Sequence, residues 1–539
     1  MAQIQESFTQ TKYHIDIPTK DLLSWIFHNQ LYNQDKPILI DTENTKNSLS
    51  SKQCKSLIRK LIAGFHATGL KQGDCVYYPC IFLAIIGSGL VFTGTNPSYT
   101  PFELVHHIRI SKSKMIITEA DISTNIMTAA KECDISDDRI LFFNQDEATL
   151  PLASSNIRSW FTLFQHGEAD WQRFDNLSTA KKTTACRLFT SGTTGLPKAA
   201  PISHYNLIAQ HTLLHEQVKK PYEVKRILCL PFFHAAMIPM AMATPLRLGH
   251  IGYIMRRFEL EKFLQVTESH AITEFFLVPP IIISILTSQL TARYSLKSIR
   301  WGVIGGAPID ETSRKQISEL VHPDGRINMV WGMTECTCVG ASFSWPEGDD
   351  TGSIGRFLPT LEVKLVDDEG KPIQDYNTTG EICIRGPTII GGYFENPQAN
   401  AESFENGWFH TGDIAFCDKD TEKWYIELIK VRGFQVAPAE LEEVLLKHPD
   451  IIEAAVIGVQ LKHIGEGEVP RAYVVQRSGL LRNLTKENLK DFVSRRLAKY
   501  KRLDGGVIFV ENLPKSASGK ILKRELRERA KLEVLRAHL

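Results

Sequence analysis

The segment with the most distinctive chemistry is a short loop rich in hydroxyl groups and glycine. It lies within Leu188-Phe-Thr-Ser-Gly-Thr-Thr-Gly-Leu-Pro-Lys198, where every residue from Thr190 to Thr194 is a glycine or carries a hydroxyl group. Backbone N–H groups and hydroxyls in such a loop bind phosphate oxygens, and Lys198 adds positive charge. A flexible Ser/Gly loop is the alternative. The strand-like run before the loop and the Pro-Lys after it favour phosphate binding, although the spacing of Gly195 and Lys198 excludes a Walker loop.

Three charged residues farther along the chain could complete a nucleotide site. Glu335 follows a strand-like run and a glycine turn, and a carboxylate beside a triphosphate is a natural Mg²⁺ ligand. Asp413 lies in a Thr-Gly-Asp turn that suits bidentate hydrogen bonding to ribose hydroxyls, unless the carboxylate only stabilises its own turn. Lys520, in Ser-Ala-Ser-Gly-Lys, could neutralise charge that develops between a carboxylate and an α-phosphate. Taken alone, Glu335 and Lys520 would be interpreted as solvated residues.

Two residues with rings have less specific surroundings. Trp331 could stack on adenine, belong to the core, or do both, because its ring is large and flat. His234 ends the run Leu230-Pro-Phe-Phe-His234. A single histidine on an apolar run is usually a hydrogen-bonded core residue, so a role in binding needs further support.

The elements that must position these residues alternate between strand-like and helix-like patterns. Strands are expected at 114–118, 139–143, 253–255, 272–279, 299–304 and 326–331, and an amphipathic helix at 259–269. Strand, helix and strand at this spacing predict layers of parallel sheet and helix, so the expected fold class is α/β.

The pattern changes near residue 360. A hairpin region is expected over 361–385, followed by short α+β units with helices at 438–447, 486–500 and 520–535 and strands at 454–458, 472–476 and 507–510. We therefore predict an N-terminal α/β domain over residues 1–426 and a small, mobile α+β domain over residues 427–539.

Composition excludes several classes of protein. The 539 residues exceed the size of one core, and the 43% apolar and 23% charged fractions are typical of globular proteins. A net charge of +1 indicates neither a nucleic-acid-binding protein nor one drawn to an anionic membrane. The start of the chain is polar and the apolar runs are short, which predicts no secretory signal and no membrane span. The ten scattered cysteines indicate free thiols.

The loop resembles the phosphate loop of the adenylate-forming (AMP-binding) enzymes, and six further segments resemble their motifs in the same order. The closest resemblance is to acyl- and aryl-CoA ligases similar to 4-coumarate–CoA ligase. The further segments are Gly305-Gly-Ala-Pro308, Trp331-Gly-Met-Thr-Glu335, Gly380-Glu-Ile-Cys-Ile-Arg-Gly386, Gly407-Trp-Phe-His-Thr-Gly-Asp413, Lys430-Val-Arg-Gly-Phe-Gln-Val-Ala-Pro-Ala-Glu440 and Pro514-Lys-Ser-Ala-Ser-Gly-Lys520. The resemblance extends from about residue 20 to about residue 530.

The resemblance implies a role for each matching position. It implies that Lys520, Lys198 and His234 act in catalysis, that His234 also gates the acyl pocket, and that Glu335 binds Mg²⁺. The implied ATP- or AMP-binding residues are Thr190, Ser191, Gly192, Thr193, Thr194, Gly195, Lys198, Gly306, Ala307, Trp331, Gly332, Thr334, Asp413, Lys430 and Lys520. The implied CoA-binding residues are Arg257, Arg432 and Gly433. The implied acyl pocket contains His234, Ala235, Ala236, Phe276, Gly305, Gly306, Val339 and Gly340, and its small residues at 235 and 236 suggest room for a bulky acid.

Two segments are shorter than their counterparts in the family. Relatives typically have Trp-Tyr-Ile-Val-Asp-Arg at the domain boundary, whereas this chain has Trp424-Tyr-Ile-Glu-Leu-Ile-Lys430, which lacks the hinge Asp and a ribose-binding Arg. A second loss follows Gly73-Asp-Cys-Val76, where relatives have a longer strand and an Asn-containing loop. Both losses are in frame, as misjoined exons or a decaying gene would produce.

The expected function is that of a carboxylic acid–CoA ligase. ATP and an aryl or acyl acid would give an acyl-adenylate and pyrophosphate, and CoA would then displace AMP. The first alternative is a catalytically impaired protein that binds nucleotide or acyl groups, favoured by the missing hinge. The second is an enzyme that loads a carrier protein. The carrier would be a separate protein, because the 19 residues after Lys520 are too few for a carrier domain.

The C-terminal residues predict a location. Ala-His-Leu539 has the small, basic and leucine pattern of the Ser-Lys-Leu peroxisomal address, and Arg536 precedes it. We therefore expect recognition by a peroxisomal import receptor, with the cytoplasm as the alternative if the helix simply ends there.

Overall fold

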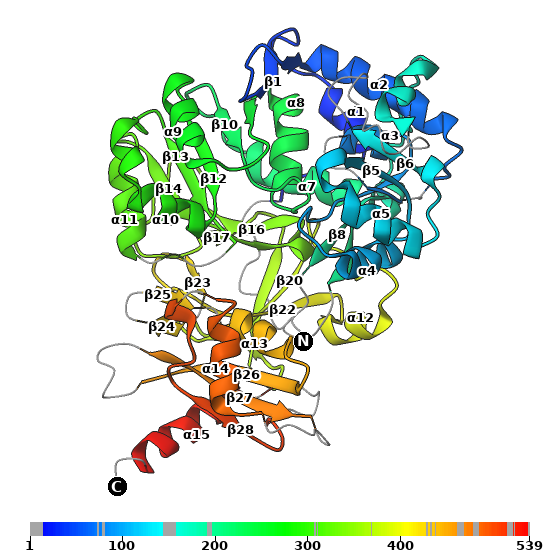
Figure 1. The fold of residues 1–539 in the computed structure, drawn as a ribbon. Helices are drawn as coiled ribbons and strands as arrows, with labels where there is room; N and C mark the ends of the chain where they lie inside the picture. Colours follow the sequence, from blue (N-terminus) through cyan, green and yellow to red (C-terminus); the bar gives the residue numbers. More distant parts are fainter. Residues whose placement is uncertain are drawn as a thin grey trace, which may run out of the picture.

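Figure 1 shows the computed structural model of the chain. It describes residues 14–72, 75–77, 81–143, 158–190, 197–306, 309, 311–367, 369–426, 429–431, 434–436, 438–460, 468–477, 484–497, 499–514, 521 and 523–536. Within these ranges the chain forms two large sheets, smaller antiparallel sheets below them and a C-terminal α+β unit. The predicted α/β fold class is confirmed.

The first large sheet carries the predicted phosphate loop. Its strands lie in the order β7-β6-β5-β3-β4-β8-β9. The bounds are β3 (Cys75–Tyr77), β4 (Val91–Thr93), β5 (Ser113–Glu119), β6 (Ile140–Phe143), β7 (Arg158–Ser159), β8 (Thr184–Thr190) and β9 (Lys198–Ser203). The strands pair in parallel except β8 and β9, which form an antiparallel hairpin. The strands predicted at 114–118 and 139–143 are β5 and β6.

The predicted loss after Val76 falls at β3. This strand has three residues, whereas its neighbour β5 has seven. Residues 73–74 and 78–80 lie outside the described residues, so the loss itself stays a prediction.

The second large sheet has the order β14-β13-β12-β10-β11-β1-β2. Its strands are β1 (Pro37–Asp41), β2 (Ser48–Ser50), β10 (Lys225–Leu228), β11 (Ile251–Ile254), β12 (Glu274–Leu277), β13 (Trp301–Ile304) and β14 (Arg326–Met329). Helices α9 (Leu260–Ser269), α10 (Pro279–Thr287) and α11 (Glu311–Leu320) connect strands of this sheet and lie on its outer side (Figure 1). Phe275 and Leu277 of β12 pack with Phe263 of α9 and Ile282 of α10. The predicted alternation of strand and helix in this region is confirmed.

Side chains of a strand alternate between its two faces, so Glu274 and Phe276 of β12 point away from that helical core. The inner face is bordered by the end of α7 (His204–His215) and by the sheet of β15 (Trp331–Met333), β16 (Cys338–Ser342) and β17 (Arg356–Phe357). The run predicted as one strand over 326–331 is divided, because Arg326–Met329 pairs with β13 whereas Trp331 begins the β15–β16 hairpin.

An antiparallel sheet below these layers carries the Thr-Gly-Asp turn. Its path is β19-β18-β20-β22-β21, and β23 pairs with β22. The bounds are β18 (Glu362–Val366), β19 (Pro372–Ile373), β20 (Gly380–Arg385), β21 (Phe404–Glu405), β22 (Trp408–Cys417) and β23 (Trp424–Ile426). The hairpin region predicted over 361–385 is confirmed by β18 and β20, which pair antiparallel.

The C-terminal unit, orange to red in Figure 1, has apolar cores of its own. It contains the hairpin β24 (Ile429–Val431) and β25 (Phe434–Val436), the sheet β26 (Ile451–Val459), β27 (Val469–Gln476) and β28 (Val507–Phe509), and helices α13 (Pro438–Leu446), α14 (Lys486–Ser494) and α15 (Lys523–Arg536). Residues 427–428 lie outside the described residues, so the boundary after residue 426 stays a prediction.

The helix predicted over 486–500 is shorter than expected. It ends at Ser494, and a separate 3-10 turn covers Lys499–Lys501. The chain turns here because Leu503 must reach the same core as Leu489 and Val493.

No helix in the described ranges is long and apolar enough to cross a membrane. Every cysteine whose side chain the structure describes is a free thiol.

Candidate active site

The β8–β9 hairpin presents the ends of the predicted phosphate loop. Thr190 and Lys198 are register partners at its tip. Residues 191–196, which include the predicted ligands Ser191, Gly192, Thr193, Thr194 and Gly195, lie outside the described residues. The backbone N–H of Phe394 donates to the carbonyl of Ala199 at 2.9 Å, so the segment around residue 394 is attached to this hairpin.

Tyr393 joins the hairpin to the predicted metal ligand. The Lys198 Nζ lies 4.9 Å from the centroid of the Tyr393 ring, and the Tyr393 hydroxyl donates to Glu335 Oε1 at 2.8 Å. Burial, together with the Glu335 carboxylate, raises the pKa of Tyr393, so the phenol stays protonated and donates. Tyr393 lies outside the motifs that the sequence offers. The available signal was its place after Gly391-Gly392, close behind the Gly380–Gly386 motif.

Glu335 lies in the 3-10 turn Thr334–Cys336 and is only 3% exposed. Its carbonyl accepts a hydrogen bond from the Ile390 N–H at 3.0 Å, which fixes the turn. Among the described residues, Tyr393 donates to Oε1 and no donor reaches Oε2. A carboxylate oxygen without a donor, close to Lys198 and Tyr393, fits a hard cation such as Mg²⁺.

Trp331 and Asp413 form the second pair of the site. The indole Nε1–H of Trp331 donates to Asp413 Oδ2 at 2.8 Å. Burial raises the pKa of Asp413, whereas the Trp331 hydrogen bond and the charge of Lys523 act to lower it. The Trp331 ring is 8% exposed and meets Phe357 edge-on at 5.5 Å. Trp331 is therefore a buried aromatic residue that orients Asp413, and its stacking on adenine stays a prediction.

A buried glutamate fixes the turn that carries Asp413. Glu381 Oε1 accepts from the Gly412 N–H at 3.0 Å, and its Oε2 lies 2.9 Å from His410 Nδ1. The Thr411 hydroxyl accepts from the Asp413 N–H at 3.1 Å and donates to the Ile382 carbonyl at 2.9 Å. The Asp therefore does not need to stabilise its own turn, which leaves Oδ1 available for a ligand.

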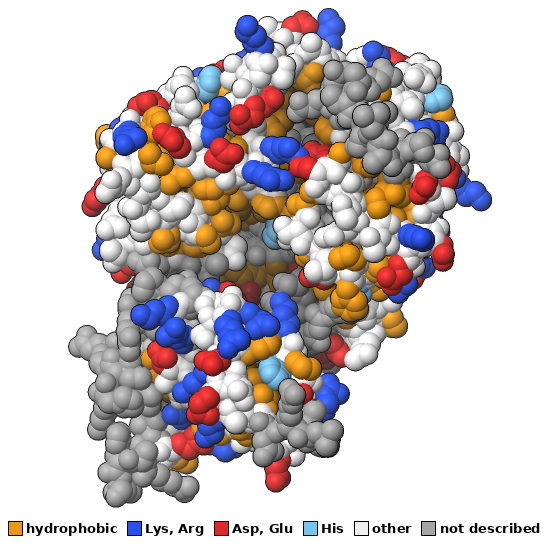
Figure 2. Space-filling view, in the orientation of Figure 1, with side chains coloured by type: hydrophobic (Ala, Val, Ile, Leu, Met, Phe, Trp, Pro, Cys, Tyr) orange, Lys and Arg blue, Asp and Glu red, His pale blue; other side chains and the backbone are white. Residues whose placement is uncertain are grey.

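The start of α15 approaches these residues from the C-terminal unit. Lys523 pairs with Glu442 at 2.7 Å and lies close enough to Asp413 to lower the pKa of that carboxyl group against the effect of burial. Lys520 precedes α15 and lies outside the described residues. Figure 2 shows a hollow between the N-terminal body and the C-terminal unit, with Lys and Arg side chains on the C-terminal side of it.

The predicted acyl pocket is brought together only in part. Ala236 and Phe276 pack against a cluster that contains Val339, Val330 and Trp331. Ala235 belongs to a different cluster, that of the first sheet. His234 lies in an exposed turn in which its backbone N–H donates to the Pro231 carbonyl at 3.0 Å. Partial desolvation of the ring by the surrounding protein lowers the pKa of His234.

Glycines allow the backbone to approach closely behind this cluster. A Cβ added to Gly305 would lie 2.6 Å from Val330 Cγ1, and one added to Gly332 would lie 1.8 Å from the Cys338 carbonyl oxygen. Gly332 is therefore required for the β15–β16 hairpin, whatever its role toward nucleotide. Gly306 follows Gly305, Gly340 lies on β16 and Thr334 begins the Glu335 turn, whereas Ala307 lies outside the described residues.

Of the three predicted CoA-binding residues, the structure describes only Arg257. Arg257 is exposed and lies 3.5 Å from Asp121, as expected of a solvated cation. Arg432 and Gly433 lie outside the described residues. Lys430 lies on β24 opposite Gln435, and its predicted contact with nucleotide stays a prediction.

Comparison with known proteins identifies the family. A model described as AMP-binding enzyme matches residues 27–394, and one described as AMP-binding enzyme C-terminal domain matches residues 440–520. The chain is 46% identical to phenylacetyl-CoA ligase epaB of Aspergillus niger, over 97% of this chain and 99% of that protein. It is 34% identical to 4-coumarate–CoA ligase 1 of Arabidopsis thaliana, over 94% of this chain and 92% of that protein.

A solved structure shows the same fold. The anthranilate CoA ligase AuaEII in complex with anthranoyl-AMP superposes with a TM-score of 0.69 at 21% identity, covering 97% of this chain and 99% of that one. The predicted resemblance is thus confirmed from both sequence and fold. The chain belongs to the AMP-binding enzyme family, and it is an ATP-dependent carboxylic acid–CoA ligase.

Proposed function

We propose that this ligase activates a carboxylic acid with an aromatic or other apolar body and that Lys198, Glu335, Asp413 and Lys520 carry the chemistry. The observation that supports these roles most directly is the contact of Tyr393 with both Lys198 and Glu335, beside the hairpin tip that the sequence predicts to hold phosphates. The name of the 46% identical relative and the apolar surroundings of Phe276 favour an aryl or arylacetic acid.

In the first half-reaction, a carboxylate oxygen of the acid forms a bond to the α-phosphorus of ATP, and pyrophosphate leaves with the electron pair of the broken P–O bond. The loop around residues 190–198 would hold the phosphates, and Asp413 would hold the ribose hydroxyls through its free oxygen. Lys520 would neutralise the negative charge of the carboxylate and the α-phosphate as they approach.

Glu335 would hold Mg²⁺, with Tyr393 fixing the carboxylate. When bound, the ion neutralises phosphate charge. In the second half-reaction the CoA sulfur forms a bond to the acyl carbon, the thiol proton is lost and AMP leaves. The basic side chains beside the hollow in Figure 2 suit the phosphates of CoA.

The test is acid-dependent exchange of labelled pyrophosphate into ATP, followed by detection of the acyl-CoA. Wild-type protein should exchange pyrophosphate with aryl or arylacetic acids. Lys520→Ala should lower the exchange by roughly 10²–10³, the usual effect of removing a positioned charge or donor. Equal exchange rates for the variant and the wild type would refute the role of Lys520.

We further propose that the C-terminal Ala-His-Leu539 directs the enzyme to peroxisomes. The pattern of the three residues supports this, although residues 537–539 lie outside the described residues. A fluorescent protein fused ahead of residues 528–539 should give a punctate signal that becomes diffuse when Leu539 is deleted. A diffuse signal from the intact tail would reject the address and favour the cytosol.

A further inference from the structure

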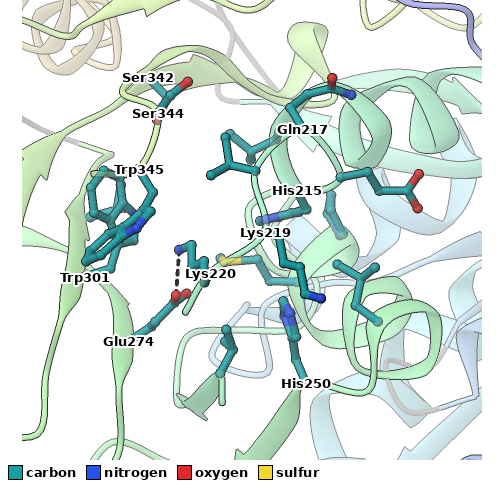
Figure 3. A pocket seen from close by; sticks show the side chains of 18 of the residues that line it. His215, Gln217, Lys219, Lys220, His250, Glu274, Trp301, Ser342, Ser344 and Trp345 are labelled. Carbon is teal, nitrogen blue, oxygen red and sulfur yellow. Dashed lines mark hydrogen bonds and ion pairs between the residues drawn. The ribbon is translucent and has the colours of Figure 1, made fainter. Parts of the chain in front are cut away.

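A cavity of about 930 Å³ lies on the inner face of the second sheet. Its floor is formed by β10, β12 and β13, and its other walls by the end of α7, the segment after it and the β16–β17 connection. Ligand pockets for drug-sized molecules measure roughly 300–1,000 Å³, so the cavity is large for a small aromatic acid. Figure 3 shows the side chains that line it.

The inner end of the cavity touches the predicted acyl pocket. Phe276 and Val339, both predicted to contact the acid, line the cavity together with Val303 and Val330. Val330 in turn lies against Gly305, where an added Cβ would be 2.6 Å from Val330 Cγ1. Phe276 and Val339 are thus shared by the predicted acyl pocket and the cavity.

The outer end is polar and contains an excess of cations. Glu274, 1% exposed, lies at the floor and binds Lys220 Nζ at 2.5 Å and Arg226 Nη2 at 2.6 Å. Tyr222 also donates to Glu274, at 2.9 Å. Burial acts to raise the pKa of Glu274, but the two cations outweigh it and lower the pKa to about 2. At the floor, one carboxylate thus faces two cations, whereas the other acidic residues that line the cavity, Glu216, Glu223 and Glu347, each pair with an arginine or lysine.

Several polar nitrogen atoms at this end lack partners within the described part of the chain. Arg226 Nη1, on a side chain that is 9% exposed, and the ring nitrogens His215 Nε2 and His250 Nδ1 are buried without a hydrogen bond. Burial lowers the pKa of both histidines, so they are neutral groups at physiological pH. Buried polar atoms are normally satisfied, and unsatisfied ones beside a cavity indicate a missing partner.

Lys219 provides a further cation at the mouth. It lines the cavity on an exposed segment, and no acidic side chain within the described ranges pairs with it. Figure 3 shows its side chain extending toward His250. Two other lysines that line the cavity are paired with acidic residues, Lys220 with Glu274 and Lys36 with Glu223.

Aromatic rings form the wall opposite Lys219. Trp301 and Trp345 meet edge-to-face at 5.7 Å, and Tyr222 meets Trp345 at 5.3 Å. Figure 3 shows both tryptophans on one side of the cavity and the two histidines on the other. The cavity is thus apolar at the acyl end, aromatic in the middle and cationic at the mouth.

We propose that this cavity receives the distal part of the acid, and that the acid carries a second anionic group, such as a carboxylate, which binds Lys219 and the Arg226–Lys220 cations. The proposal rests on the proposed function, because the reacting carboxyl group must lie at the adenylation site. The apolar middle of the acid would contact Val303 and Trp345. A charge-assisted hydrogen bond at an exposed lysine changes affinity by roughly tenfold.

The test compares straight-chain dicarboxylic acids with their monomethyl esters, which keep the length and one free carboxyl group but lack the second charge. Binding is followed by tryptophan fluorescence, with Trp345→Phe identifying the signal of the cavity, and activation by pyrophosphate exchange. Wild type should bind at least one diacid more than tenfold more tightly than its ester, and Lys219→Met should lower this preference by about tenfold, because Lys220 and Arg226 remain. Lys225→Met is the matched control, because Lys225 pairs with Glu223 and does not line the cavity.

The outcomes separate the two proposals. Equal affinity of diacid and ester for the wild type, or an unchanged preference in Lys219→Met, would overturn the cavity assignment even if both acids are adenylated. A Lys219-dependent preference in the fluorescence titration supports the cavity assignment, and a lack of pyrophosphate exchange with the same acids would count against the adenylating roles proposed above.

Discussion

Replacing Trp331 with Phe tests whether the indole of this residue orients the Asp413 carboxylate, which is proposed to bind ribose. The substitution keeps an aromatic ring against Phe357 and removes the hydrogen bond of 2.8 Å to Asp413 Oδ2. The other hydrogen bonds of the turn do not involve the Asp413 carboxylate. They join the Thr411 hydroxyl, the N–H groups of Gly412 and Asp413, the Ile382 carbonyl and Glu381.

The magnitude follows from the kind of bond that is lost. A hydrogen bond to a charged group is worth about 1.5–3 kcal/mol, which corresponds to roughly 10–100-fold in an equilibrium constant. Burial raises the pKa of Asp413, and the indole opposes that rise. In Trp331→Phe the pKa should therefore be higher, and the carboxylate should be lost at a higher pH as the solution is acidified.

The assay is pyrophosphate exchange at ATP concentrations below KM, between pH 5 and 8. The variant should lose roughly 10–100-fold in kcat/KM for ATP, and its acid limb should move to higher pH. Trp408→Phe is the control, since Trp408 begins β22, the strand that carries Asp413, and is also buried, but its ring contacts Lys364 and Arg385. An unchanged kcat/KM and pH profile in Trp331→Phe would refute the orienting role.

Four further predictions follow from other contacts. Tyr393→Phe should raise KM for MgATP by about tenfold in the same exchange assay, because it removes the hydroxyl bound to the proposed metal ligand and keeps the ring. Glu274→Gln should lower the free energy of unfolding by about 3–5 kcal/mol in urea titration, since two buried cations lose their counter-charge. Burial lowers the pKa of His204 to about 4, whereas an unfolded histidine has a pKa of about 6.5. The neutral buried ring therefore contributes its full stability above pH about 6.5, and this contribution decreases as the pH falls toward 4. His204→Asn should reduce the loss of stability between pH 7 and 5 by about 2 kcal/mol. Inserting Val-Asp-Arg-Lys-Lys between Ile426 and Glu427 should increase thioester formation more than pyrophosphate exchange, because domain reorientation separates the two half-reactions.

Each of these has an outcome that contradicts it. The Tyr393 prediction is wrong if KM is unchanged. The Glu274 prediction is wrong if the variant is no less stable than Glu223→Gln, whose more exposed pairs should contribute only about 0–1 kcal/mol. The His204 prediction is wrong if both proteins lose equal stability on acidification. If the insertion alters neither half-reaction, the inferred loss after Ile426 has no functional effect.

The strands of the two large sheets could be predicted because each is a short apolar run between turn signals. The cores of parallel sheets are buried on both faces, so the runs at 114–118 and 272–279 are nearly continuous in hydrophobicity. Two boundaries could not be predicted in this way. The end of α14 depends on Leu503 packing beside Leu489, and the division of 326–331 depends on which strand pairs with Trp331.

The predicted site residues were found through motifs, whereas their partners were not. Glu335 and Asp413 each depend on a group far away in the sequence, namely the Tyr393 hydroxyl and the Trp331 indole. No local pattern encodes such a pairing, because the hydrogen bond exists only after several sheets have assembled. The sequence predicted that the Trp331 ring stacks on adenine or belongs to the core, but its role as a hydrogen-bond donor became visible only from its distance to Asp413.

The cavity shows why specificity is harder to infer than chemistry. Its lining combines Lys219, Glu274 and Trp345, which lie on separate segments and belong to no motif. On β12, Phe275 and Leu277 face the core with α9, whereas Glu274 and Phe276 face the cavity. A substitution on the cavity side can therefore change which acid fits while the opposite side keeps the strand in register. Since the hairpin that is predicted to bind phosphates belongs to the other large sheet, the choice of acid can change without altering the groups proposed to activate it.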